Sequence, residues 1–186
     1  MLESHPLASI PPALRGKILA LLLALTLIAM AVFALTGAPL QTHEAPLGII
    51  SWQVAGSVEA AERMLASWDN AARVRAAFGL GFDYLFMVIY ATTIALACLW
   101  ASDELRRRGW PLQAKGPALA WGLWLAALLD AIENAAQVIM LFDAVRAPWP
   151  QISFVCASLK FSLILLGLLY VIYGVWAAIG RRLSAG

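Results

Sequence analysis

The sequence contains little charge and almost no cysteine. Only 13% of its 186 residues are Asp, Glu, Lys or Arg, whereas about a quarter is usual for a soluble domain. Hydrophobic residues make up 62% of the chain, which is more than one globular core of this length can bury. The composition therefore excludes an ordinary soluble domain and predicts that lipid surrounds part of the chain.

The sequence also lacks the motifs of several functional classes. Its net charge of +2 is too small for a nucleic-acid surface. Cys98 and Cys156 form no Cys-x-x-Cys motif and are expected to be small packing residues, too far apart for a disulfide. His5 and His43 lie outside the long apolar stretches, so they do not favour haem ligation. No metalloprotease, serine-hydrolase or phosphate-binding motif occurs, so no metal site is predicted and no cofactor is identified.

Four apolar stretches are long enough to cross the hydrocarbon core of a bilayer, which requires about 20 helical residues. The first is longer than the apolar region of a secretory signal peptide, so we interpret it as a span. The predicted spans cover residues of about 17–36, 75–100, 117–142 and 152–179. We predict an all-α membrane protein in which residues 1–186 form one integral membrane domain, a four-transmembrane-helix bundle.

The segment between the first two predicted spans contains an amphipathic helix. Ser57 is a favourable N-cap residue, and Glu59 follows in the first turn, where negative charge is stabilising. Apolar residues recur at helical spacing from Val58 to Trp68, and charged residues occupy the other face. We predict an interfacial helix over about 57–68, with its apolar face against lipid or against the bundle. Its role is either a structural lid or a gate over a site below it.

The distribution of Lys and Arg predicts the orientation, because these residues are enriched in cytoplasmic loops. One side of the predicted bundle has twice as many of them as the other. The richer side contains Arg15, Lys17, Arg106, Arg107, Arg108, Lys115, Arg181 and Arg182, and the other side contains Arg63, Arg73, Arg75 and Arg146. We therefore predict that both termini are cytoplasmic and that the protein resides in the plasma (inner) membrane.

Four ionisable residues lie inside the predicted spans, where charge is energetically costly. An ionised Asp, Glu or Lys at the centre of a membrane helix costs roughly 2.5–3.5 kcal/mol on insertion scales. These residues are Asp83, Asp130, Glu133 and Lys160. Such groups must satisfy each other or contact water, so we expect them to point into the bundle.

Helical spacing places these charges on stripes that face inward. Residues at i, i+3, i+4 and i+7 of the third span lie on one side of the helix. Lys160 shares its stripe with small residues such as Ser153 and Gly174, and small residues mark the faces where membrane helices approach each other. On the second span, Asp83 shares a stripe with Tyr90. The predicted ligand-binding residues are Asp83, Tyr90, Asp130, Glu133, Asn134, Gln137 and Lys160.

Depth along the helices predicts which charges meet. At about 1.5 Å per residue, Asp83, Glu133 and Lys160 lie at a similar depth. We therefore expect Lys160 to lie within reach of Asp83 or Glu133, and in a purely structural network it would bridge the two. Three carboxylates around one ammonium group cannot all stay charged in a dry bundle. Asp130 is predicted to lie deepest and farthest from Lys160, so it is the acid that we expect to be protonated.

The sequence favours binding over catalysis without identifying the ligand. We predict a small polytopic membrane protein that binds a small or lipid-like ligand at the intramembrane polar site, with translocation as a further expectation. One alternative is a structural or accessory subunit of a membrane complex. Another is a membrane enzyme that acts on a lipid, with Asp130 or Glu133 as the general acid or base. The expected partners are the bilayer, such a ligand, and a second copy or a membrane partner subunit, but no nucleic acid.

The orientation can be tested with single cysteines at Ser57 and Ser102, in a background that lacks Cys98 and Cys156. We expect an impermeant thiol reagent to label the Ser57 site in intact cells, because residues 42–70 are predicted to lie outside. The Ser102 site should stay unlabelled until the cells are opened. Labelling of the Ser102 site alone in intact cells would reverse the orientation.

Overall fold

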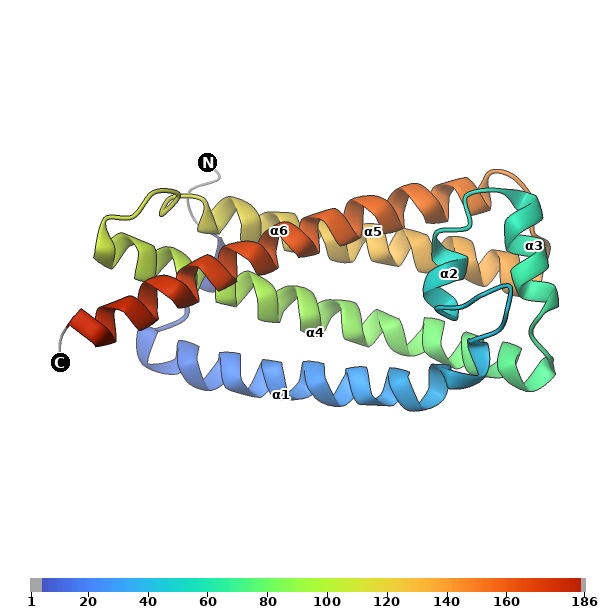
Figure 1. The fold of residues 1–186 in the computed structure, drawn as a ribbon, viewed down its shortest axis with the longest axis horizontal. Helices are drawn as coiled ribbons and strands as arrows, with labels where there is room; N and C mark the ends of the chain where they lie inside the picture. The colour runs from blue at the N-terminus through green and yellow to red at the C-terminus, as the bar shows by residue number, and fades with distance from the viewer. Residues whose placement is uncertain (1–4, 185–186) are drawn as a thin grey trace. The chain divides into compact units, whose positions relative to one another are not determined.

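The computed structural model describes residues 5–184, with side chains at all of these positions except 12 and 181–184. Arg181 and Arg182, which contribute to the predicted orientation, therefore lie outside the described side chains. Every regular element in the described range is helical (Figure 1). Four helices are long and apolar enough to cross a membrane, namely α1 (Pro12–Gly37), α4 (Asn70–Arg108), α5 (Gly116–Phe142) and α6 (Trp149–Ser184). The prediction of four apolar helices of membrane-spanning length is confirmed.

Helix α4 shows why the observed helices run beyond the predicted spans. It covers residues 70–108, whereas the predicted span covers about 75–100. The Asp69 side chain caps its start by accepting a hydrogen bond from the Ala72 N–H group at 2.7 Å. Three arginines in the last turn stabilise the negative end of the helix dipole. The apolar pattern locates the part that can cross a membrane, and polar ends extend the helix past it.

The chain divides into two compact units, and each long helix contributes a segment to both. The first, named here the capped unit, comprises residues 27–87 and 128–160. The second, the base unit, comprises the described residues 5–26, 88–127 and 161–184. All predicted site residues except Tyr90 belong to the capped unit.

The connection between α1 and α4 forms a cap in the capped unit. It contains the short helices η2 (Ala38–Leu40), α2 (Ile49–Gln53) and α3 (Val58–Ala66), beside the turn that joins α5 to α6 (Figure 1). Two buried indole rings lie at its centre, with centroids 5.3 Å apart. The Nε1–H group of Trp52 donates to the carbonyl of Ala61 at 3.1 Å. That of Trp68 donates to the carbonyl of Leu40 at 2.9 Å. The cap is therefore a packed element with its own hydrophobic core.

Helix α3 corresponds to the predicted amphipathic helix, but it is shorter than the predicted range of 57–68. The Ser57 hydroxyl accepts a hydrogen bond from the Ala60 N–H group at 3.2 Å, which confirms the predicted N-cap. Ala61 is fully buried in the hydrophobic core of the cap, whereas the charged residues of the opposite face are exposed. The apolar face thus packs against protein, which is one of the two surroundings that the sequence predicts.

Small residues of α6 allow close helix packing in the base unit. A Cβ atom at Gly174 would collide with Ala101 of α4. The Sγ atom of Cys98 lies 3.6 Å from the carbonyl oxygen of Gly167. Both Cys98 and Cys156 are free and buried, as expected for packing residues. The stripe of small residues predicted on the last helix therefore includes its contacts with α4.

The segment before α1 packs onto α5 through His5, within the base unit. The imidazole ring contacts Trp121 and Trp124 edge-on, at centroid distances of 4.8 Å and 4.5 Å. Its Nδ1 atom accepts a hydrogen bond from the Leu7 N–H group at 3.2 Å and caps the short helix η1 (Pro6–Ser9). Desolvation by burial lowers the pKa of His5 below its ordinary value of 6.5. The docked segment therefore contains a neutral imidazole.

Acidification should release this segment, because His5 docks in its neutral form. The undocked histidine binds a proton below about pH 6.5, so docking is fully favourable above that pH and weakens as the pH falls. We expect hydrogen exchange at residues 7–10, corrected for the intrinsic rate, to accelerate between about pH 7.5 and about pH 5.5. His5→Asn retains a capping oxygen without a titrating group and should show no acceleration. An equal response of the two proteins would contradict this assignment.

Candidate functional site

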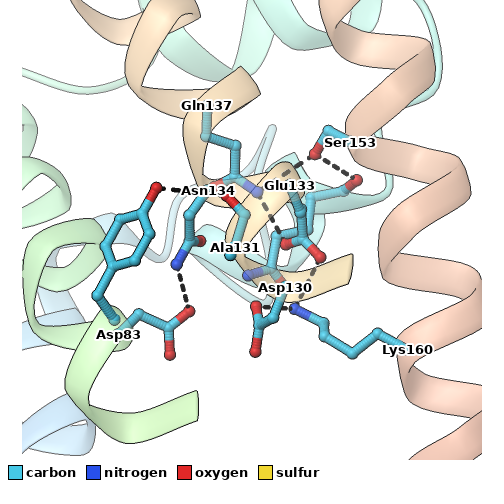
Figure 2. A network of polar contacts seen from close by, with 10 residues as sticks. Asp83, Asp130, Ala131, Glu133, Asn134, Gln137, Ser153 and Lys160 are labelled. Atoms are coloured by element: carbon cyan, nitrogen blue, oxygen red, sulfur yellow. Dashed lines mark hydrogen bonds and ion pairs between the residues drawn. The ribbon is translucent and has the colours of Figure 1, made fainter. Parts of the chain in front are cut away.

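Polar side chains from α4, α5 and α6 converge in the capped unit (Figure 2). Four of them lie on one side of α5, at the i, i+3, i+4 and i+7 positions that the sequence predicts. The exposed fraction is 2% for Asp130, 0% for Glu133 and 4% for Lys160. The polar cluster, as defined here, consists of Gln53, Asp83, Asp130, Glu133, Asn134, Gln137, Ser153 and Lys160. Its charges are therefore withdrawn from the surface of the helices.

Lys160 of α6 bridges two acids of α5. Its Nζ atom lies 2.7 Å from Oδ1 of Asp130 and 2.7 Å from Oε2 of Glu133. The predicted contact with Glu133 is confirmed, but the prediction that Asp130 lies farthest from Lys160 is wrong. Residues at i and i+3 are separated by only about 4.5 Å along a helix and share a face. A lysine that faces this turn therefore reaches both acids, which the comparison of depths did not consider.

Asp83 of α4 pairs with an amide of α5. Its Oδ2 atom accepts a hydrogen bond from the Asn134 Nδ2–H group at 2.8 Å. The neighbouring Tyr84 hydroxyl donates to the carbonyl of Ala131 at 3.3 Å, which is a second link between α4 and α5. Asp83 is half-buried, whereas Asn134 is fully buried. The acid on α4 therefore lies at the edge of the polar cluster.

The ion pairs bear on where a proton resides. Three carboxylates around one ammonium group cannot all stay charged in a dry bundle. Asp130 and Glu133 both lie 2.7 Å from the Lys160 ammonium group, whereas Asp83 pairs with a neutral amide. We therefore expect the proton on Asp83 rather than on Asp130, the acid chosen from the sequence.

A chain of hydrogen bonds connects the acids to the cap. The Nε2 group of Gln137 donates to Oε1 of Glu133 at 2.9 Å and to the Ser153 hydroxyl at 3.2 Å. The Ser153 hydroxyl in turn donates to the carbonyl of Gln53, in α2 of the cap, at 3.1 Å. Sequence reasoning placed Ser153 on the inward stripe of α6 without assigning it a role, and it missed Gln53. No periodic signal marks Gln53, because α2 has only five residues.

Two amide side chains leave acceptors without partners inside the polar cluster. The Nδ2 group of Asn134 faces a carboxyl oxygen, and so does the Nε2 group of Gln137. Exchanging oxygen and nitrogen in either amide would bring two acceptors together, so this orientation is fixed. As a result Asn134 Oδ1 and Gln137 Oε1 are buried and have no donor among the described residues. The Oε1 atom of Gln53 is in the same situation.

One predicted site residue, Tyr90, is buried and belongs to the base unit. Its grouping with Asp83 rested on helical spacing alone. Within residues 5–184, no group of three His, Cys, Asp or Glu side chains has the arrangement of a metal site.

Comparison with known proteins finds no relative of this chain. No protein-family model matches the chain, and no match is found among the curated proteins or the solved structures.

The charged members of the polar cluster should respond differently to neutral substitution. Lys160→Met leaves two buried carboxylates without their partner and should lower the free energy of unfolding by about 3–5 kcal/mol. Asp130→Asn removes a charged hydrogen bond and should lower it by about 1.5–3 kcal/mol. Asp83→Asn reproduces the shape of a protonated acid and should lower it by less than about 1 kcal/mol. Denaturant-induced unfolding of the purified protein in detergent micelles measures these differences.

Asp143→Asn is the matched control for this series. Asp143 is an exposed acid of the capped unit that pairs with the exposed Arg146, three residues further on, so its loss should change stability little. If Asp83→Asn proves as damaging as Asp130→Asn, Asp83 is an ionised member of the network and the proposed location of the proton is wrong.

Proposed function

We propose that this chain is an integral membrane protein that binds a small ligand rich in hydrogen-bond donors at the polar cluster. The observation that supports this is an excess of acceptors. The polar cluster contains three carboxyl groups but one ammonium group, that of Lys160. It also contains three buried amide oxygens that have no donor in the described part of the chain. A ligand with N–H or O–H groups supplies the donors that this set lacks.

The unpartnered oxygens favour binding over a purely structural role. An unsatisfied buried acceptor costs about 1–3 kcal/mol, and hydrocarbon supplies no hydrogen bond in return. A network that only specified the bundle would be expected to satisfy all of its members, because a partly satisfied network is worse than an apolar core. Asn134 and Gln137 each leave their carbonyl oxygen without a donor. These two residues are therefore the proposed acceptors for the ligand.

The remaining members of the polar cluster have supporting roles in this proposal. Asp130 and Glu133 provide negative charge that attracts hydrogen-bond donors and cations. Lys160 is their counter-ion and compensates part of that charge inside the bundle. The bond from Ser153 to Gln53 couples the cap to the site. The excess of Lys and Arg on the opposite side of the predicted bundle supports an orientation with the cap outside and both termini in the cytoplasm.

Thermal unfolding in detergent micelles tests the proposed function. The probes are alkylammonium ions, alkylguanidinium ions and polyols, each in a water-soluble and a long-chain form. We expect at least one of them to raise the Tm of the wild type by about 5 °C at saturation. The same probe should have no such effect on Glu133→Gln, whereas Asp143→Asn should respond like the wild type.

A second variant keeps the test decisive if Glu133→Gln does not fold. Asp83→Asn alters the half-buried edge of the polar cluster, where we expect a change to be tolerated. If no probe distinguishes the wild type from either cluster variant, the polar cluster is structural and the proposed function is wrong.

A further inference from the structure

The polar cluster reaches the protein surface at one side chain. Asp83 is half-buried, whereas the side chains of the other seven members are buried. At the end that faces the cap, the side chains of Ser153 and Gln53 are buried. A ligand that reaches the buried acceptors without unfolding the cap therefore has to pass Asp83.

An apolar ring lies beside Asp83 on the surface. Tyr84, the next residue of α4, exposes 43% of its surface. It lies in the apolar part of a helix that is long enough to cross a membrane, so hydrocarbon is the solvent that its ring suits. A water-soluble ion would have to leave water and cross hydrocarbon to arrive there, which is costly. A molecule with a polar headgroup and an apolar chain keeps its chain in lipid while the headgroup enters.

The acceptors at this entrance select the headgroup. Asp83 offers a carboxyl group, and the next residue inward, Asn134, offers a buried Oδ1 atom without a donor. A primary ammonium group provides both positive charge and three N–H donors for these atoms. A quaternary ammonium group provides the charge but no donor, and an alcohol provides a donor but no charge.

From this geometry we infer that the ligand is a single-chain or lipid amphiphile with a primary ammonium headgroup, which enters from the bilayer past Asp83. The inference rests on the proposed function, because it names the ligand class of the same site. The ammonium group binds between Asp83 and Asn134, and the apolar chain stays in lipid beside Tyr84. The proton expected on Asp83 leaves as the ammonium group binds, so the charge of the site is unchanged.

Four probes separate the parts of this inference. Dodecylammonium, dodecyltrimethylammonium and dodecanol are compared at one mole fraction in detergent micelles, and butylammonium is added at the same total concentration. We expect dodecylammonium to raise the Tm of the wild type by about 5 °C at saturation. The other three probes should give less than half of that shift. Asp83→Asn should lose most of the dodecylammonium effect, whereas the control Asp143→Asn should retain it.

Each other outcome overturns a defined part. An equal shift with butylammonium would exclude entry from the bilayer, and an equal shift with dodecyltrimethylammonium would exclude recognition of N–H donors. A full dodecylammonium shift in Asp83→Asn would exclude the entrance. If guanidinium ions or polyols give a shift that depends on Glu133 while dodecylammonium does not, the proposed function stands and the ligand class is wrong. If Asp83→Asn instead changes the particle mass and no probe binds, Asp83 belongs to an interface between copies.

Discussion

The pairing of one lysine with two acids on a single turn of α5 determines how the capped unit can be built. Lys160 lies 2.7 Å from both Asp130 and Glu133, and all three side chains are almost fully buried. Separating these groups would leave uncompensated charge in a low-dielectric interior, at a cost of about 3–5 kcal/mol. The position of α6 against α5 is therefore restricted to arrangements that keep the ammonium group between the two carboxylates.

Other features of the capped unit follow from this restriction. Gln137, one turn along α5 from Glu133, uses both of its N–H bonds on Glu133 and Ser153, and Ser153 donates to α2 of the cap. These two bonds fix the orientation of the Gln137 amide, and its carbonyl oxygen then faces no donor among the described residues. The same arrangement that holds the lysine thus joins the cap to the bundle and creates the excess of acceptors on which the proposed function depends.

Periodicity predicts some of these features and not others. The apolar stretches locate the four long helices, and the i, i+3, i+4, i+7 spacing identifies the side of α5 that forms the polar cluster, because both depend on local geometry. The partner of Lys160 depends on the rotation of α6 about its axis and on side-chain reach, neither of which depth along a helix describes. Gln53 was missed for a related reason, because a five-residue helix has no period to read. Asp69 was a readable N-cap whose signal would have placed the start of α4 correctly.

A double-mutant cycle between α5 and α6 tests the central claim most directly. Unfolding free energies of Lys160→Met, Glu133→Gln and the double variant give the coupling between the two side chains, and the same cycle is measured with Asp130→Asn and with Asp83→Asn. The structure predicts couplings of about 1–3 kcal/mol for Glu133 and Asp130, and additivity within about 0.5 kcal/mol for Asp83. Additive losses for Glu133 and Asp130, or a strong coupling confined to Asp83, would contradict the account.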